Sequence, residues 1–199
     1  MMVSPSSEAS SPYGSSQPSN LLKINLIGLH TIVHKEIRRL FRIWVQTMVP
    51  PVITMTLYFI IFGTLIGQRI GEMDGVPYTT FIAPGLIMMS VITSAYGNVS
   101  SSFFSTKFQK SIEEMLVAPV PNWVILAGYV GGGVVRGILV GIVVSILSLW
   151  FTDLAVHNFF VMASVVVLTA VVFSLAGFIN GILATKFDDV AIVPTFILT

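Results

Sequence analysis

Two pairs of adjacent carboxylates are the first groups in this sequence that could do chemistry. Glu113-Glu114 and Asp188-Asp189 could in principle serve as general acids or bases, but neither pair has a histidine partner beside it. The motifs HExxH, GxSxG and GxxxxGK(S/T) do not occur, and no lysine follows the glycines Gly131-Gly132-Gly133. We therefore expect no catalytic site and no metal site in this chain, and an intramembrane enzyme is disfavoured.

Arg136 is the second residue whose type and place call for an explanation. It is the one ionisable group in a long apolar stretch, where an arginine costs about 2.5–3.5 kcal/mol near the bilayer centre. We expect it to pair with a backbone carbonyl, with Asn98 or Asn180, with a lipid or with a substrate. Two roles stay open, a structural role in folding and a contact with substrate along a transport pathway.

The composition indicates whether the chain is a water-soluble protein or a membrane protein. Of 199 residues, 54% are hydrophobic and 10% charged, and the net charge is +1, whereas soluble domains carry about 25% charged residues. The mean hydropathy is +0.89. A cytosolic enzyme, a disordered regulator and a nucleic-acid binder are disfavoured, and the absence of cysteine excludes disulfides and thiolate sites. The chain is expected to be an all-α membrane protein.

Long gaps between charged residues predict the membrane spans. About 20 apolar residues cross a bilayer core as a helix, and four stretches are long enough. They are expected near residues 50–66, 79–103, 124–150 and 159–184. A fifth apolar run, residues 190–199, is too short to cross and is expected to be the start of a fifth helix.

Lysine and arginine counts in the connecting segments predict the orientation. Eight lie in the segment before the first span and in the second and fourth connections, against Arg69 alone in the first connection and none in the third. The positive-inside rule then places the N-terminus in the cytoplasm.

The segment before the first span divides in two. Residues 1–20 are rich in Ser and Pro, contain neither Lys nor Arg, and are expected to be a disordered cytoplasmic tail. Residues 21–46 show apolar residues at helical spacing, with cations on another face, which indicates an amphipathic helix in the membrane interface. The alternative is a cytoplasmic extension of the first span. Pro50-Pro51 favours the interfacial interpretation, with a bend at the prolines.

Small residues recur every fourth position in two of the spans. Such a strip lets another helix approach closely, either within this chain or in another copy. The candidate packing residues are Gly133, Gly137, Gly141, Ser145, Gly177 and Gly181.

The second connection predicts a short helix. Ser111 can cap it, Glu113 and Glu114 fall in its first turn, and prolines end it. By chemistry alone, a docking helix for a soluble partner and an ordinary solvated loop are equally compatible with this segment.

Several of these segments together resemble the ABC-2 type permeases. The resemblance covers about residue 21 to the end. It is carried by residues 47–51, 61–63, 84–93, 111–121, 128–133, 187–189 and 192–196.

The resemblance implies a six-helix permease that forms a homodimer and binds two copies of a separate ATPase subunit, which would hold ATP and Mg. The amphipathic helix would be the family's connecting helix. The coupling helix that meets the ATPase would comprise Ser111, Ile112, Glu113, Glu114, Met115, Leu116, Pro119 and Pro121. Residues 47–199 would then be a partial ABC-2 transmembrane domain. Spans five and six have no counterpart here, so the resemblance implies a C-terminally truncated chain.

The expected function is therefore the permease subunit of an ABC-2 exporter in the bacterial inner membrane. The permease would couple ATP hydrolysis by its partner to efflux of an amphipathic, glycan-type or lipid-type substrate, and would itself have no enzymatic activity. The competing hypothesis is a helical membrane scaffold that does not transport and assembles through the small-residue strip.

Overall fold

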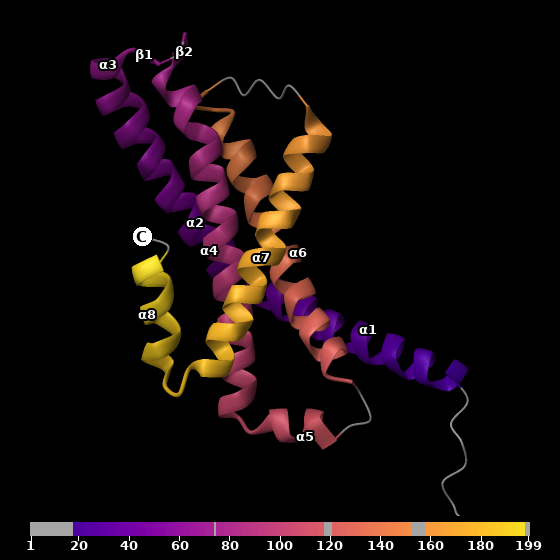
Figure 1. Ribbon diagram of the computed structural model, residues 1–199. Helices are drawn as coiled ribbons and strands as arrows, with labels where there is room; N and C mark the ends of the chain where they lie inside the picture. The colour runs from indigo at the N-terminus through magenta and orange to yellow at the C-terminus, as the bar shows by residue number, and fades with distance from the viewer. Residues whose placement is uncertain (1–17, 74, 118–120, 153–157, 198–199) are drawn as a thin grey trace, which may run out of the picture.

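A computed structural model describes residues 18–73, 75–117, 121–152 and 158–197. Among these, four helices are long and apolar enough to cross a membrane, which confirms the all-α membrane fold. Figure 1 shows them as a bundle, with α1 projecting from one side. The four spans are Trp44–Ile70, Tyr78–Phe108, Asn122–Ser148 and Phe159–Leu183.

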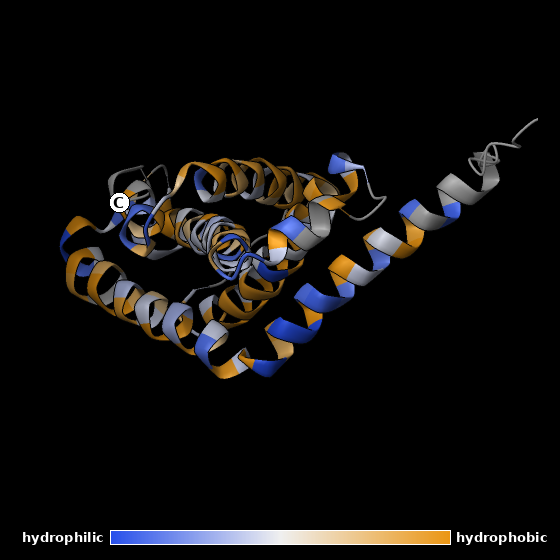
Figure 2. Ribbon diagram, turned by 90° about the horizontal axis from the view of Figure 1, so that it is seen from below, coloured by the Kyte–Doolittle hydropathy of each residue, from blue (hydrophilic) through white to orange (hydrophobic). Residues whose placement is uncertain are grey.

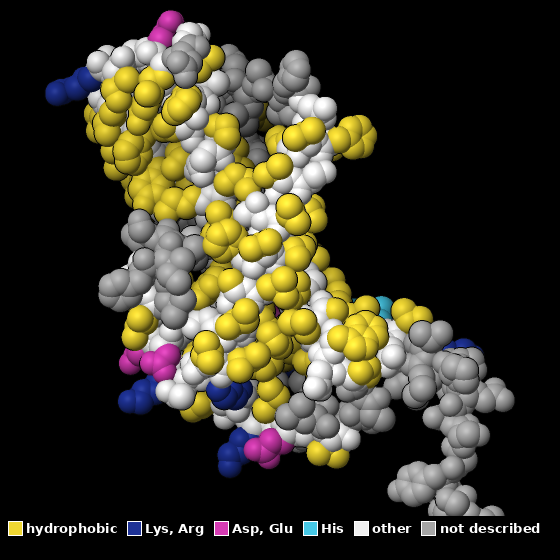
Figure 3. Space-filling view, in the orientation of Figure 1, with side chains coloured by type: hydrophobic (Ala, Val, Ile, Leu, Met, Phe, Trp, Pro, Cys, Tyr) yellow, Lys and Arg dark blue, Asp and Glu magenta, His cyan; other side chains and the backbone are white. Residues whose placement is uncertain are grey.

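The spans contain 27, 31, 27 and 25 residues, whereas about 20 residues suffice for a bilayer core. The first two are longer than the charge gaps indicated and include Arg69 and Lys107 near their ends, while the last two have nearly the expected length. Charged residues thus lie near the ends of the first two spans. Figure 3 shows the result on one face, with hydrophobic side chains over the middle of the molecule and charged ones at its two ends.

The helix α1 (Pro18–Arg42) precedes the first span and packs against α6 (Asn122–Ser148). Its inner face consists of Ile32, Glu36 and Leu40, all buried. Leu26 and Phe41, expected on the apolar side, are each 65% exposed. Seen from below, α1 extends away from the bundle and mixes hydrophilic and hydrophobic residues along its length (Figure 2). Residues 1–17, most of the expected disordered tail, lie outside the described residues.

The bend between α1 and the first span lies at Ile43 and not at the prolines. Ile43 has φ −113° and ψ 30°, outside helical geometry, and α2 (Trp44–Tyr58) starts immediately after it. Pro50 and Pro51 lie inside α2. A proline ring is compatible with helical φ, so the helix continues past both residues although two backbone N–H donors are missing.

The C-terminal half of the first span departs from α-helical geometry. Residues Phe59–Ile66 form the π-helix η1, and Gly67–Ile70 form α3. Phe59 is fully buried and its ring stacks on Phe151, with centroids 5.3 Å apart. Two short antiparallel strands follow, β1 (Glu72–Met73) and β2 (Val76–Pro77). The sequence showed no signal for either the π-helix or the strand pair.

The helix α4 (Tyr78–Phe108) is the centre of the bundle, with extensive contacts to α6 and to α7 (Phe159–Leu183). Its buried residues include many small polar side chains, among them Ser90, Ser94, Ser100 and Ser102. Small side chains allow neighbouring helices to approach closely where no difference in hydrophobicity drives them together.

The last described helix, α8 (Phe187–Ile197), has 11 residues and does not meet the criteria for a span. It is held against the bundle by Phe187, whose ring lies 4.8 Å from that of Phe104, and by the Asn180 amide, which donates to the Val190 carbonyl at 3.2 Å. Lys107 closes the end of α7, since its ammonium donates to the carbonyls of Ile182 (2.7 Å) and Ala184 (2.9 Å).

Asp189 should make the turn before α8 sensitive to acid. Its Oδ2 accepts hydrogen bonds from the Thr185 hydroxyl (2.7 Å) and from the backbone N–H groups of Thr185 and Lys186 (2.9 Å each). The Thr185 hydroxyl, followed by these two N–H groups, lowers the pKa of Asp189 below its ordinary value. Because the folded-state pKa is depressed, the stabilisation is present above the ordinary aspartate pKa and is lost as pH falls through the folded-state value.

We expect the protection of the Thr185 and Lys186 amides against hydrogen exchange to fall over that acidic range. In Asp189→Asn, protection should be low at every pH. The exposed neighbour provides the control, because Asp188→Asn should retain the wild-type pH profile. Equal profiles for wild type and Asp189→Asn would contradict the assignment.

Candidate functional site

The short helix α5 (Ser111–Val117) lies at one end of the bundle, between α4 and α6 in the chain (Figure 1). The chain turns into it at Lys110, which has a positive φ of 58°. Ser111 is the first helical residue, so the position before the helix is occupied by Lys110 and not by the expected serine cap. The Lys110 carbonyl accepts from the Glu113 N–H at 3.1 Å and starts the first turn.

One side of α5 is fastened to the bundle core. Ile112 packs on a buried hydrophobic cluster that joins three helices, and its members are Ile32 of α1, Val99 and Phe103 of α4, and Ile125 and Tyr129 of α6. The opposite side faces away, since Glu113 is exposed and Val117 is 86% exposed. The side chains of Glu114, Met115 and Leu116, and all of Pro119, lie outside the described residues. Pro121 immediately precedes α6.

The small-residue strip of α6 faces α4 of the same chain. A Cβ added at Gly133 would lie 2.3 Å from Val99 Cγ2 and 2.5 Å from Ser174 Oγ, and one at Gly141 would lie 2.7 Å from Val91 Cγ2. Gly137 lies between them and approaches Ala95. The question left open by the sequence, a partner in this chain or in another copy, is thus answered by α4. Ser145, the last of the strip, is half-buried.

Three further glycines allow neighbouring helices to approach closely. Gly177 and Gly181 of α7 lie against the backbone of α4, where an added Cβ would approach Tyr96 O to 2.5 Å and Ser100 O to 3.2 Å. On another face of α6, a Cβ at Gly132 would lie 2.7 Å from Glu36 Cβ. That second contact seats α1 directly on α6.

Arg136 is paired within the bundle. Its Nη1 donates to Asn98 Oδ1 at 3.2 Å, and the same oxygen accepts from Arg39 Nη2 at 3.1 Å. Asn98 is one of the two asparagines that the sequence singled out. Asn180, the other, donates to Ser100 Oγ at 3.0 Å.

The sequence analysis did not identify Glu36 as a possible partner of Arg136, because Glu36 precedes the first span. The residue lies on α1, is 4% exposed and accepts from the Ser102 hydroxyl at 2.6 Å. Its Oε2 lies 4.0 Å from Arg39 Nε. The available signal was its position four residues from both Ile32 and Leu40, on the face that became buried. Together Glu36, Arg39, Asn98, Ser102 and Arg136 form what we call the arginine cluster.

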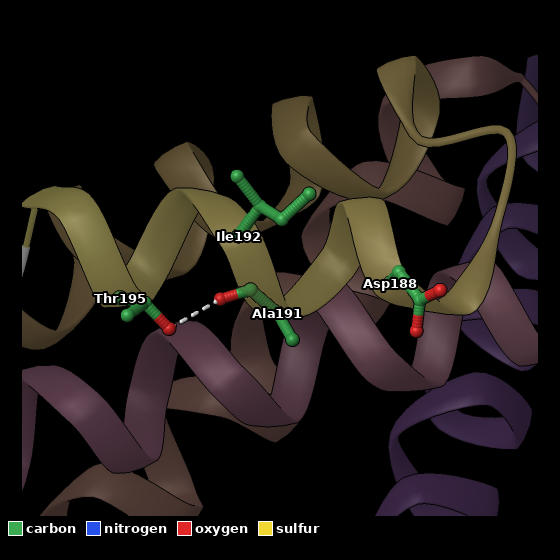
Figure 4. A pocket seen from close by; sticks show the side chains of 4 residues that line it. All are labelled: Asp188, Ala191, Ile192 and Thr195. Atoms are coloured by element: carbon green, nitrogen blue, oxygen red, sulfur yellow. Dashed lines mark hydrogen bonds between the residues drawn. The ribbon is translucent and has the colours of Figure 1, made fainter.

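No group of three His, Cys, Asp or Glu side chains is close enough to hold a metal ion in the part of the chain that the structure describes. The hollow lined by Asp188, Ala191, Ile192 and Thr195 is a shallow one on α8 (Figure 4). All four residues come from one helix, and the Thr195 hydroxyl donates to the Ala191 carbonyl at 2.8 Å. The geometry therefore offers two candidate features for function, the short helix α5 attached to the core through Ile112 and the arginine cluster.

Comparison with known proteins identifies a family and several relatives of the chain. The model of a family described as ABC-2 type transporter matches residues 28–199. The inner membrane transport permease YadH of Escherichia coli (strain K12) is 63% identical over 179 residues, which cover 90% of this chain and 70% of that protein. Nodulation protein J of Rhizobium leguminosarum bv. viciae is 24% identical over 144 residues, which cover 72% and 56%. No solved structure matches.

Proposed function

The chain belongs to the ABC-2 type transporter family, and on that premise we propose that it is the permease subunit of an exporter driven by a separate ATPase subunit. The partner would bind ATP and Mg, and the permease would supply the path across the membrane. The observation that carries the proposal is the geometry of α5. It is a short helix at one end of the bundle with exposed residues on one side and a core contact on the other.

A docking helix that transmits movement must be attached to the helices that it displaces. Ile112 packs on the cluster that contains residues of α1, α4 and α6, so a displacement of α5 cannot leave those three helices where they are. Closely packed protein interiors transmit strain because their compressibility is low. The partner's movement on ATP hydrolysis would therefore shift two spans and the connecting helix together.

The distribution of positive charge supports the orientation. The end of the bundle that carries α5 also carries Lys107, Lys110 and Lys186, and the residues of α1 include five further cations. This end is proposed to be cytoplasmic by the positive-inside rule. The membrane is proposed to be the bacterial inner membrane, with the permease as a homodimer. These placements put α5 where a soluble ATPase reaches it.

The cargo is proposed to be amphipathic, of glycan or lipid type, and to move outward. Arg136 is assigned a structural role, because its guanidinium donates to Asn98 Oδ1, which also accepts from Arg39. The scaffold alternative relied on the small-residue strip as an assembly surface. That strip is covered by α4 of the same chain, which leaves the alternative without its specific support.

Charge reversal on α5 tests the proposal. With the permease co-expressed with its ABC ATPase, Glu113→Lys combined with Glu114→Lys should abolish stimulation of ATPase activity by the permease and should reduce transport about tenfold or more. The reason is that repulsion at a docking surface opposes association. Thermal unfolding of the permease should not change, because Glu113 is exposed and takes no part in the core.

The matched control is Glu72→Lys, an exposed charge reversal at the opposite end of the bundle. It should leave co-purification and ATPase stimulation as in wild type. Unchanged co-purification and transport in the α5 double variant would refute the docking assignment.

A further inference from the structure

The arginine cluster contains more positive than negative charge. Even with Glu36 ionised, Arg39 and Arg136 together leave one positive charge without a counter-ion. Within the ranges that the structure describes, Arg39–Glu36 is the one ion pair found. A charge at a bilayer boundary that has no counter-charge is costly, so such groups pair with an anion where one is within reach.

The two arginines of the cluster lack hydrogen-bond acceptors within reach. Asn98 Oδ1 is shared by the two guanidinium groups, and Arg39 Nη2 reaches the Asn98 carbonyl only at 3.5 Å. Arg136 Nε is buried and has no hydrogen-bond partner among the described residues. Glu36 Oε2 is also buried without such a partner, and it lies 4.0 Å from Arg39 Nε, beyond hydrogen-bond distance. A guanidinium carries several N–H donors and no acceptor, so an oxyanion with several oxygens would supply both acceptors and the missing negative charge.

One member of the cluster, Arg39, lies next to the start of the first span. The first span begins at Trp44, which is 58% exposed and suited to the membrane–water interface. Arg39 precedes Trp44 by little more than one helical turn, and its side chain remains 27% exposed. Arg136 is half-buried and joined to it through Asn98. An anion can therefore approach Arg39 from the lipid side.

The outer face of α1 is suited to the same kind of ligand. Lys35, Arg38 and Arg42 are exposed along it, and basic residues at the cytoplasmic membrane surface attract anionic lipids. Exposed apolar side chains, Leu26, Ile27 and Phe41, lie on the same helix and suit contact with acyl chains. The charges and the apolar groups together indicate a lipid rather than a free ion.

We propose that Arg39 and Arg136 bind the phosphate of one anionic phospholipid at the junction of α1, α4 and α6. Arginine recognises phosphate through paired N–H donors, and the phosphate supplies the charge and the acceptors that the cluster lacks. The site goes beyond the proposed transport function, since the lipid is a resident ligand. It takes the membrane level from the span bounds and does not depend on an ATPase partner.

Native mass spectrometry of the full chain tests the site by counting lipid adducts. The chain is exposed to phosphatidylglycerol, phosphatidylcholine or inorganic phosphate, at an ionic strength that screens exposed charges. Wild type should retain one phosphatidylglycerol per chain in preference to phosphatidylcholine. Arg39→Gln and Arg136→Gln should each weaken that binding about tenfold to a hundredfold, the loss of charge-assisted hydrogen bonds. Arg69→Gln, the same change at an exposed arginine at the other end of the bundle, should bind as wild type.

Thermal unfolding supplies the second measurement. Phosphatidylglycerol should raise the midpoint of wild type and of Arg69→Gln, because a ligand of the folded state stabilises it, and should leave Arg39→Gln unchanged. Inorganic phosphate should shift none of them. Equal affinity of wild type for the two lipids would overturn the proposal, and so would full stabilisation by inorganic phosphate or an Arg69→Gln loss equal to that of Arg39→Gln. The lipid preference of wild type decides the matter even if Arg136→Gln does not fold. Loss of ATPase coupling would have no bearing on this outcome, and the two proposals can fail separately.

Discussion

Replacing Gly177 with alanine should lower the free energy of unfolding by about 2–3 kcal/mol. The added Cβ would lie 2.5 Å from Tyr96 O and 3.2 Å from Tyr96 Cα, all backbone atoms of α4. A flexible side chain could move aside, but a backbone carbonyl inside a helix cannot, so α7 would have to separate from α4. Thermal unfolding in detergent, followed by circular dichroism, measures the effect.

The control for Gly177→Ala uses a glycine with room around it. At Gly131 in α6 the nearest atom to an added Cβ is Val33 Cγ2 at 3.7 Å, an ordinary contact. Gly131→Ala should therefore be neutral or stabilising by up to about 1 kcal/mol, since alanine favours the helix over glycine. Similar destabilisation in both variants would show that the close contact at Gly177 is not what determines stability there.

Replacing Glu36 with glutamine should destabilise the fold by about 2–3 kcal/mol, below the 3–5 kcal/mol typical of a broken buried pair. The smaller value is expected because Arg39 is partly exposed and 4.0 Å away. Glutamine keeps the shape and can still accept from the Ser102 hydroxyl, which now lies 2.6 Å from Glu36 Oε1. What is lost is the one negative charge in the arginine cluster. Denaturant or thermal unfolding measures the change.

A double variant separates charge from shape in this prediction. Combining Glu36→Gln with Arg39→Gln removes one charge of each sign, and the pair should cost less than the sum of the single changes. Glu113→Gln, an exposed carboxylate on α5, should stay within about 0.5 kcal/mol of wild type. Full stability of Glu36→Gln would mean that the buried carboxylate does not balance the arginines.

The two effects arise from the same property of the bundle. In a membrane, helices do not associate to escape water, and close packing and polar contacts take over that task. Gly177 permits the close approach of α7 and α4, and Glu36 supplies a polar contact of α1 with α4. The core is therefore sensitive both to one added methyl group and to one removed charge.

The number of spans and their order followed from the sequence because charge is excluded from a bilayer core. Apolar stretches of sufficient length, one of which contains Arg136, identified all four spans, and the family resemblance is confirmed by the match over residues 28–199. The lengths of the last two spans also followed, whereas the first two helices continue beyond the apolar region, where water satisfies their polar side chains. The bend at Ile43 was likewise misplaced at Pro50, since a proline marks a missing donor rather than a necessary break.

The site shows the same division. Residue types alone identified α5 as a short helix and Arg136 as a group in need of an acceptor, because local capping chemistry and the cost of a buried charge are properties of single segments. Tertiary structure alone decided what each meets. Glu36 and Asn98 are 62 residues apart in the sequence, by the difference of their numbers. The packing of α4 on α6 brings Asn98 to Arg136, and the crossing of α1 over α6 brings Glu36 into the same cluster. The periodicity of α1 could assign a face to Glu36, but which face becomes buried depends on the helix packed against it.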